Sequence, residues 1–406
     1  MHRSTTHGAA LSLGRANVIL FAAATAAATA AAFGVADIAG YERLAAIVRT
    51  LHLDWLAVCF GGQVLAYLGY VLAVRAVARA GGGPRLSFSL SARTVVAGFG
   101  VYAAAHTSGG FSVDYWALRR AGVPRREALA RVLGLGALEY AVLAPAALVS
   151  ALVLLAGEGG HVQDAMTLPW LAVIPGIVAA AWVSSPKRAG RLAEPGDGGR
   201  VRHAFAHAVA GVTMLRSLLR RPVRHAGGLA GAALYWVGDI ACLWAALAVV
   251  GVEISMPALI VAYGAGYVLS RRSLPSGGAG VVEVLMTFAL AGVGVPLAPA
   301  FVAVIVYRLF NFWLPILPAL AILPSVRELR WDSLAAERTG HRACTHLSST
   351  GPRPPADAEL PAQRLSRLVP AEKWGWRRIG RAAPGGSAPG CTKSSRLTPW
   401  TFGDLS

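Results

Sequence analysis

The sequence predicts an all-α, polytopic membrane helix bundle. Hydrophobic residues make up 55% of the chain, charged residues only 14%, and the mean hydropathy is +0.53. A soluble domain usually has about a quarter of its residues charged. Several apolar runs reach about 18 residues or more, which is enough to cross a hydrocarbon core about 30 Å thick. Together these observations predict several transmembrane helices.

The candidate membrane elements are apolar runs separated by charged or glycine-rich segments. They lie at about 16–40, 54–78, 91–107, 132–156, 167–184, 227–250, 256–270, 279–294 and 297–324. The first run is rich in alanine and follows a basic start, as a cleaved signal peptide also would. Its length favours an uncleaved membrane span.

Loop charges predict which side of the membrane each connection faces, because cytoplasmic loops carry an excess of Lys and Arg. The segments 75–93, 113–131 and 185–225 are rich in Arg and are expected to be cytoplasmic. The segment 157–166 contains Glu158 and Asp164 without Lys or Arg, so it is expected outside. Residues 203–221, "HAFAHAVAGVTMLRSLLRR", suggest an amphipathic helix on the inner leaflet.

Two segments cannot each cross the membrane once without breaking the charge rule for loops. The weakly apolar stretch 91–112 lies between two basic loops, so it is expected to enter and leave the membrane on the same side. The stretch 256–294 is expected to form a second re-entrant hairpin, entered from outside. The count is then about six spans plus two hairpins, with both termini cytoplasmic. The alternative makes 256–270 and 279–294 full spans, which gives eight spans.

A weak internal repeat supports the two hairpins. "HTSGGFSVDYWALRRAGV" at 106–123 is similar to "LPSGGAGVVEVLMTFALAGV" at 274–293, and the SGG triplets begin at Ser108 and Ser276, 168 residues apart. Each copy falls in one predicted hairpin, and the two hairpins enter from opposite faces. Inverted-topology repeats have this arrangement, with interrupted helices meeting near the midplane around a substrate site.

The chain is expected to have one membrane domain with two flanking segments. Residues 1–15 form a cytoplasmic N-terminus, 16–326 the transmembrane domain, and 327–406 a disordered basic tail rich in Pro, Gly and Ser. The net charge of +18 lies in the loops and the tail. It favours anionic membrane lipids over nucleic acid as partners.

The stretch "RRSLPSGGAGVVEVLM" at 271–286 places cations, a helix break and a carboxylate together. Arg271 and Arg272 are candidates for holding a lipid phosphate by bidentate hydrogen bonds. Ser276, Gly277 and Gly278 let backbone N–H groups approach the anion at the start of the next helix. The alternative is a pair of ordinary cytoplasmic arginines after a span.

Carboxylates within apolar runs are further candidates, because a charge at the bilayer centre costs at least about 2.5 kcal/mol and normally has a partner. Glu283 follows the second SGG turn, and Asp114, expected nearer the surface, follows the first. Glu139, Asp239 and Arg308 each lie inside long apolar runs. Pairing among these groups is expected, but the sequence leaves open which pairs form and whether they are structural or bind substrate.

The segments "SLPSGGAGVVEVLM" and "VYRLFNFWLPILPALAIL" resemble the lysylphosphatidylglycerol synthase transmembrane-region family, a family of flippase-like domains. The resemblance covers about residues 16–326. The residues that match the family pattern are Pro275, Gly277, Gly278, Gly280, Glu283, Tyr307, Arg308 and Pro315. The earlier segment "SGGFSVDYWALRRAGV" corresponds more loosely, with Asp114 or Trp116 near the place of a Gly-Glu pair.

The resemblance implies a multi-pass plasma-membrane protein that moves a charged lipid between leaflets. Full-length synthases carry a soluble aminoacyl-transferase domain after the membrane part, and here the corresponding segment is a short tail. A phospholipid or polyprenyl-phosphate headgroup is the expected substrate, with Arg271, Arg272, Tyr307 and Arg308 among its contacts. The sequence predicts no metal or cofactor, and no nucleotide-binding or catalytic motif stands out. The alternatives are a membrane-embedded glycosyl or aminoacyl transferase component and a non-transporting partner protein.

Overall fold

The computed structural model describes residues 33–104, 109–157, 164–193, 200–220, 222–270 and 280–328, together with Ala26 and Ala30; their regular structure is helical. Five helical segments of this described part are long and apolar enough to cross a membrane. They are Trp55–Gly82, Arg125–Leu155, Asp164–Val183, Ala226–Val249 and Leu297–Ala319. The all-α polytopic class is therefore confirmed. Most of the predicted span 16–40, and nearly all of the predicted tail, lie outside the described residues.

The chain contains the same succession of helices twice: a long helix, two short helices and another long helical segment. The first half consists of α3 (Trp55–Arg79), α4 (Phe88–Ala104), α5 (Gly109–Arg120) and α6 (Arg125–Leu155). The second half consists of α11 (Pro222–Val249), α12 (Met256–Ser270), α13 (Val281–Gly292), α14 (Leu297–Arg308), the π-helical turn η4 (Leu309–Trp313) and α15 (Leu314–Glu328).

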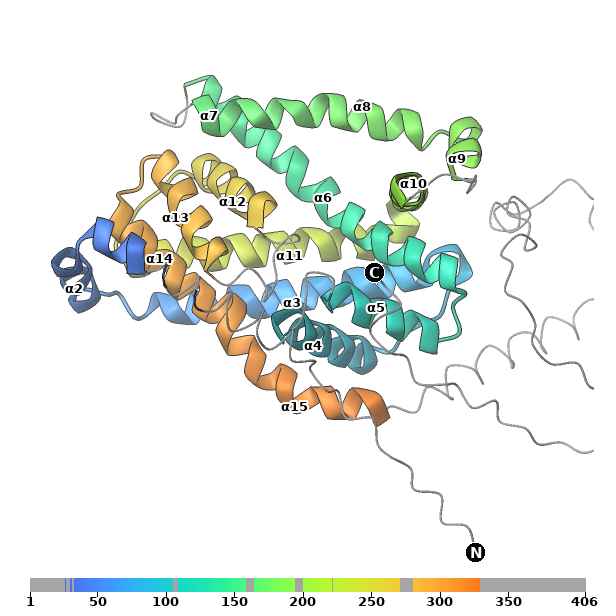
Figure 1. Ribbon diagram of the computed structural model, residues 1–406, viewed down its shortest axis with the longest axis horizontal. Helices are drawn as coiled ribbons and strands as arrows, with labels where there is room; N and C mark the ends of the chain where they lie inside the picture. Colours follow the sequence, from blue (N-terminus) through green and yellow to red (C-terminus); the bar gives the residue numbers. More distant parts are fainter. Residues whose placement is uncertain are drawn as a thin grey trace, which may run out of the picture.

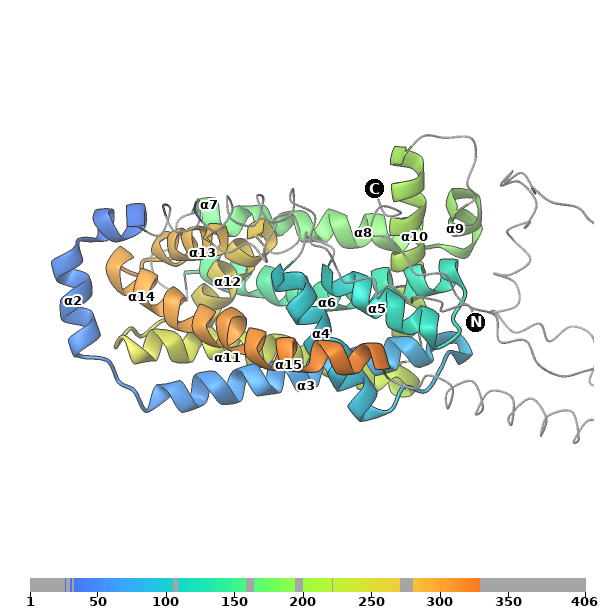
Figure 2. The same ribbon diagram turned by 60° about the horizontal axis from the view of Figure 1, so that its bottom comes forward.

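The remaining elements precede and connect the halves. They are α2 (Tyr41–Arg49), η1 (Ala80–Gly82), α7 (Asp164–Thr167), η2 (Leu168–Ala172), α8 (Val173–Val183), α9 (Pro186–Ala193) and α10 (Arg200–Leu219). Helix α2 lies at one end of the bundle and α9 and α10 lie at the other (Figures 1 and 2). These ends are called the α2 end and the α9 end below. Helix α8 has mostly exposed apolar side chains, as expected of a lipid-facing span.

Helices α3 and α11 form the central crossing of the two halves, and glycines allow their backbones to touch. A Cβ atom at Gly62 would lie 2.7 Å from the carbonyl oxygen of Gly238, and one at Gly69 would lie 2.6 Å from that of Gly231. Gly231 lies 169 residues after Gly62, and Gly238 lies 169 residues after Gly69. The contacts are thus reciprocal, because each glycine meets the counterpart of the other. Reciprocal contacts between antiparallel helices indicate a pseudo-two-fold axis, as in an isologous interface.

The two short-helix pairs lie at opposite ends of this crossing. Helices α12 and α13 lie toward the α2 end, whereas α4 and α5 lie toward the α9 end (Figures 1 and 2). At a rise of 1.5 Å per residue, the 15 residues of α12 and the 12 residues of α13 are about 22 Å and 18 Å long. Each is shorter than the hydrocarbon core of about 30 Å. This favours the predicted hairpin over two full spans at 256–294.

The first hairpin is larger than predicted. Its second arm is α5, which covers part of the segment expected to be a cytoplasmic loop, 113–131. Helix α6 also begins earlier than the predicted run at 132, so that Arg131 lies within the helix and is buried. The sequence did not predict this arm, because α5 is too polar to be recognised as a membrane segment. A 12-residue helix that packs against protein instead of lipid can form with such a sequence.

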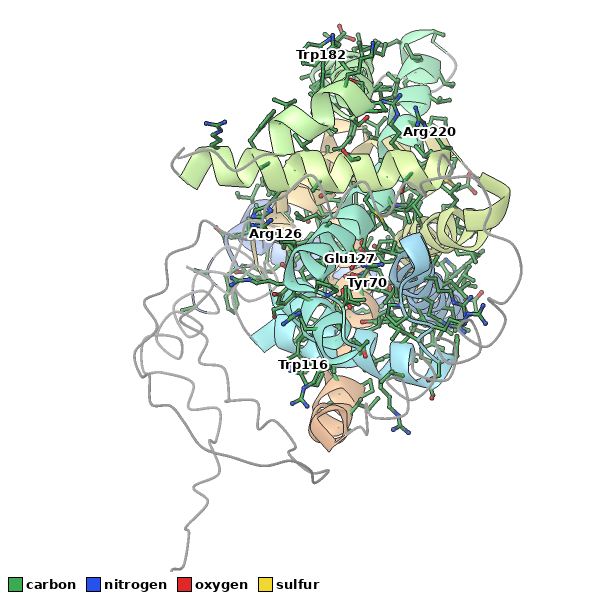
Figure 3. All side chains as sticks on the ribbon, turned by 90° about the vertical axis from the view of Figure 1, so that its right-hand side faces the viewer. Tyr70, Trp116, Arg126, Glu127, Trp182 and Arg220 are labelled. Atoms are coloured by element: carbon green, nitrogen blue, oxygen red, sulfur yellow. The ribbon has the colours of Figure 1, made fainter. Side chains whose placement is uncertain are left out.

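Basic side chains gather at the α9 end, which faces the viewer in Figure 3 with Arg126 and Arg220 labelled. The last turn of α5, which contains Arg119 and Arg120, lies at this end. The first turn of α6 lies there as well. Helix α10 runs crosswise to α3 and α11 there (Figures 1 and 2). The helix predicted at 203–221 corresponds to α10 (Arg200–Leu219), which packs on α6 where Gly134 meets Met214. By the positive-inside rule the α9 end is expected to be cytoplasmic.

Candidate functional site

A buried ion pair joins the second hairpin to the long helix that follows it. Arg308 Nε donates to Glu283 Oε1 at 2.8 Å, and the two residues are only 4% and 5% exposed. Removing one partner of such a pair typically costs about 3–5 kcal/mol, because the other charge is left buried and uncompensated. The sequence left open which embedded charges pair, and the structure pairs these two.

The N-terminus of α13 holds the glutamate in place. Gly280 has a φ of 85°, which side chains disfavour, and its N–H donates to Glu283 Oε2 at 2.5 Å. Both carboxylate oxygens are therefore engaged, one by Arg308 and one by the backbone. The guanidinium also stacks on Phe312, with Cζ 4.1 Å from the ring centroid.

One nitrogen of the buried guanidinium remains unused. Arg308 Nη2 is buried and has no hydrogen-bond partner among the described residues. Burying a charged donor without a hydrogen-bond partner carries a free-energy penalty of several kcal/mol. An anion or a carbonyl that accepts from the donor removes much of this penalty. Arg308 therefore has an open donor beside the start of α13, where the helix dipole also favours an anion.

Asp239 lies beside this pair in a dense set of donors. Tyr263 and Tyr307 both donate to Asp239 Oδ2, the latter at 3.0 Å, and Asn311 Nδ2 donates to Oδ1 at 2.5 Å. Asn311 lies in η4, the π-helical turn that directly follows Arg308. Such turns often occur at functional sites. We call Asp239, Tyr263, Glu283, Tyr307, Arg308 and Asn311 the second-half cluster.

The first half contains a differently charged cluster. Asp114 is 5% exposed and accepts a hydrogen bond from Tyr70 at 3.2 Å. It lines a cavity of about 20 Å³ together with Thr94 and Arg131, and the carboxylate of Glu139 acts on it electrostatically. Arg131 Nη2 donates to the carbonyl of Ala80 at 2.7 Å. We call Tyr70, Thr94, Asp114, Arg131 and Glu139 the first-half cluster.

A chain of tyrosines connects the two clusters through the α3–α11 crossing. Tyr70 contacts Tyr235 with ring centroids 5.6 Å apart, and the hydroxyls of Tyr235 and Tyr267 are 3.4 Å apart. Tyr267 stacks on Tyr263, which donates to Asp239. Tyr70 lies near the middle of the bundle when it is viewed from the α9 end (Figure 3). Every step from Asp114 to Asp239 is thus a hydrogen bond or a ring contact.

Trp236 holds this chain against α6. Its ring contacts Tyr235, Tyr263 and Tyr267, with centroids between 4.7 and 5.9 Å apart. Its indole N–H donates to the backbone carbonyl of Glu139 at 2.8 Å. Trp236 therefore connects the tyrosine rings to the backbone of α6.

The structure brings together the predicted residues Asp239, Glu283, Tyr307 and Arg308, and it places Asp114 with Glu139 in the other half. Asp114, which was expected nearer the membrane surface, is enclosed by residues of α3, α4 and α6. The predicted residues at 271–279 lie outside the described residues. They are Arg271, Arg272, Ser276, Gly277 and Gly278.

Sequence reasoning missed five members of the two clusters: Tyr70, Thr94, Arg131, Tyr263 and Asn311. A signal was present for Asn311, an amide within the otherwise apolar "VYRLFNFWLP". Tyr70 and Tyr263 lack such a signal, because a tyrosine in an apolar helix is usually a packing residue. Arg131 looked like one of several loop arginines.

Paired inverted hairpins around buried charges define a polytopic membrane protein with an internal pseudo-two-fold repeat. The family model for the lysylphosphatidylglycerol synthase TM region matches residues 17–319. The chain therefore belongs to that family, and the match covers both halves. None of the curated proteins compared with the chain matches it.

Proposed function

We propose that this protein is a lipid translocase that moves a phospholipid or polyprenyl-phosphate headgroup across the membrane. The observation that carries the proposal is the buried Arg308, which holds Glu283 through Nε and keeps Nη2 without a partner among the described residues. A phosphate oxygen is the ligand that suits a guanidinium donor beside a helix N-terminus. The lipid tails would remain in the bilayer.

The geometry supports this role in a second way. Glu283 balances the charge of Arg308 when no substrate is bound, and the N–H of Gly280 fixes the carboxylate. An arriving phosphate would share the guanidinium with Glu283 without unfolding the site. Arg271 and Arg272, at the start of the connection between α12 and α13, are further candidates for phosphate contacts. The protein would thus offer a polar route for a headgroup through an apolar core.

The test is lipid movement in vesicles that contain the purified protein and a fluorescent phospholipid or polyprenyl phosphate. A membrane-impermeant reductant reports how much label reaches the outer leaflet. Arg308→Lys keeps the charge but loses the planar fork, so the rate should fall about tenfold or more. Arg126→Ala, which removes an exposed arginine from the same bundle, should leave the rate unchanged.

Chromatography of the extracted lipids separates translocation from transfer. Movement of unaltered lipid that depends on Arg308 supports the proposal. Chemical conversion of the lipid would support a membrane-embedded transferase component. Well-folded protein that neither moves nor converts lipid, judged by a single symmetric peak in size-exclusion chromatography, would contradict both and leave a partner role.

A further inference from the structure

Arg308 is buried, so a lipid headgroup can reach its open donor only if part of the bundle moves. The residue is 4% exposed, and its Cζ lies 4.1 Å from the centroid of the Phe312 ring. Packed helices move mainly through a few positions that absorb the change in backbone angles. A candidate for such a position follows directly after Arg308 in the chain.

The π-helical turn η4 interrupts the long helical segment that carries Arg308. Sharp bends in helices occur mainly at prolines and π-bulges. Here η4 comprises Leu309–Trp313, and Pro315 follows in the first turn of α15. Pro315 has no N–H to donate to the carbonyl of Asn311, four residues earlier. Bending at η4 therefore costs less than bending an uninterrupted α-helix.

The corresponding helix of the first half has a different structure. Helix α6 is α-helical throughout Arg125–Leu155. It contains Pro145, which lies 169 residues before Leu314, the residue next to Pro315. A proline at this place in the repeat is therefore compatible with a continuous α-helix. The π-helical turn is a feature of the second half, and such turns often occur at functional sites.

The two hairpins attach to this segment on opposite sides of η4. Before the turn, Arg308 of α14 binds Glu283 of the second hairpin. After the turn, α15 packs on α4 of the first hairpin, where a Cβ atom at Gly100 would lie 2.7 Å from Cβ of Ala319. Helix α13 lies beside α14, and α4 lies beside α15 (Figures 1 and 2). A bend at η4 therefore moves one hairpin relative to the other.

Phe312 connects the arginine to the first hairpin through this turn. Its ring lies against the Arg308 guanidinium, and its centroid is 6.1 Å from that of Phe99 in α4. Asn311, the preceding residue, holds the turn to Asp239 of α11. A phosphate that accepts from Arg308 Nη2 pulls on the guanidinium, which is stacked on Phe312. Phosphate binding thus acts directly on the turn.

We infer that η4 is a hinge that bends when a phosphate headgroup binds Arg308, an inference that rests on the proposed translocase function. The bend moves the α4–α5 hairpin relative to the α12–α13 hairpin. Because these hairpins lie at opposite ends of the bundle, their relative movement changes the side from which Arg308 is reached (Figures 1 and 2). A ligand shifts such an equilibrium by binding one state better than the other. The phosphate does so through Nη2, which has no partner among the described residues.

The first part of the test measures hairpin movement by distances between spin labels. Ser89 in α4 and Phe288 in α13 are exposed, and each is replaced by a labelled cysteine in a chain whose Cys344 and Cys391 are serine. In maltoside micelles, which contain no phosphate, short-chain phosphatidic acid should change this distance by several ångströms. The diacylglycerol with the same tails should leave it unchanged. Labels at Val237 in α11 and Phe288, both exposed and in the second half, should keep their distance.

The second part stiffens the hinge. Pro315→Ala restores a backbone N–H after η4, so the change in distance should become smaller. The rate of lipid movement in the vesicle assay should fall about fivefold, the effect of one backbone hydrogen bond. Pro299→Ala is the matched control, because Pro299 lies in the first turn of α14, where an N–H has no partner within the helix. This variant should behave as the wild type does in both measurements.

The outcomes separate the hinge from the proposed function. Lipid movement with an unchanged distance between Ser89 and Phe288 overturns the hinge and leaves the proposed function intact. Equal rates for the wild type and Pro315→Ala do the same. A change in distance that diacylglycerol also produces overturns the coupling to phosphate. A lack of lipid movement under every condition overturns the proposed function. If Pro315→Ala does not fold, the wild-type distances decide.

Discussion

In the second half of the bundle an arginine neutralises the hairpin glutamate, whereas in the first half the corresponding aspartate is bound by a tyrosine. Asp114 and Glu283 are 169 residues apart, the same separation that relates the crossing glycines. Arg308 pairs with Glu283, while Asp114 accepts from Tyr70 and lies near Glu139. The helices of the two halves are thus arranged symmetrically, whereas the buried side chains around the two carboxylates differ.

The difference shows what the repeat requires. The α3–α11 crossing brings backbone atoms into contact, so two positions in each half favour glycine: Gly62 and Gly69 in α3, and Gly231 and Gly238 in α11. The hairpin carboxylates face side chains, which can differ as long as each buried charge is compensated. The two halves can therefore differ in the chemistry of their buried groups while they share one arrangement of helices.

The largest difference between the halves should follow from removing one charge in each. Arg308→Ala leaves Glu283 buried without a cation and should lower the free energy of unfolding by about 3–5 kcal/mol. Asp114→Asn keeps the shape and an oxygen that can accept from Tyr70, and it should cost less than about 1 kcal/mol. Thermal unfolding in detergent measures both. Equal losses would show that the two clusters are not electrostatically different.

An intermediate effect is expected where the halves are alike. In Gly62→Ala the new methyl group would lie 2.7 Å from the carbonyl oxygen of Gly238. The helices must separate, and the cost should be about 1–3 kcal/mol. Gly61→Ala is the matched control, because a Cβ there meets nothing within 4 Å and alanine favours the helix. If both variants unfold at the same temperature, the close crossing is wrong.

The smallest effect should come from single donors to Asp239. Tyr307→Phe removes one of three hydrogen bonds and should cost about 1 kcal/mol, since Tyr263 and Asn311 still donate. Tyr70→Phe removes the hydrogen bond that Tyr70 donates to Asp114 and should cost no more than Tyr307→Phe, because one hydrogen bond is lost in each variant. A loss of stability for Tyr70→Phe larger than for Tyr307→Phe would reverse the assignment of roles.

Much of the fold could be predicted from the sequence because the bilayer requires long apolar helices and biases loop charge. The hairpin at 256–294 followed from that charge argument and from the SGG repeat. The second arm of the first hairpin could not be predicted, since α5 is polar and is buried by protein rather than lipid. The ion pair of Glu283 with Arg308 was one of several options, because pairing depends on how α13 and α14 pack. The tyrosine chain depends on the α3–α11 crossing, which spacing alone does not reveal.

The central claim is that the two halves are inverted copies whose hairpins enter from opposite faces, and paired cysteine labelling tests it most directly. Ser87 and Ser255 are exposed serines that directly precede or adjoin the first arms of the two hairpins, α4 and α12. Each is changed to cysteine in a chain whose tail residues Cys344 and Cys391 are serine; Cys59 and Cys242 are buried. A membrane-impermeant maleimide should label the two positions from opposite sides of the membrane. Labelling of both from the same side would contradict the inverted repeat.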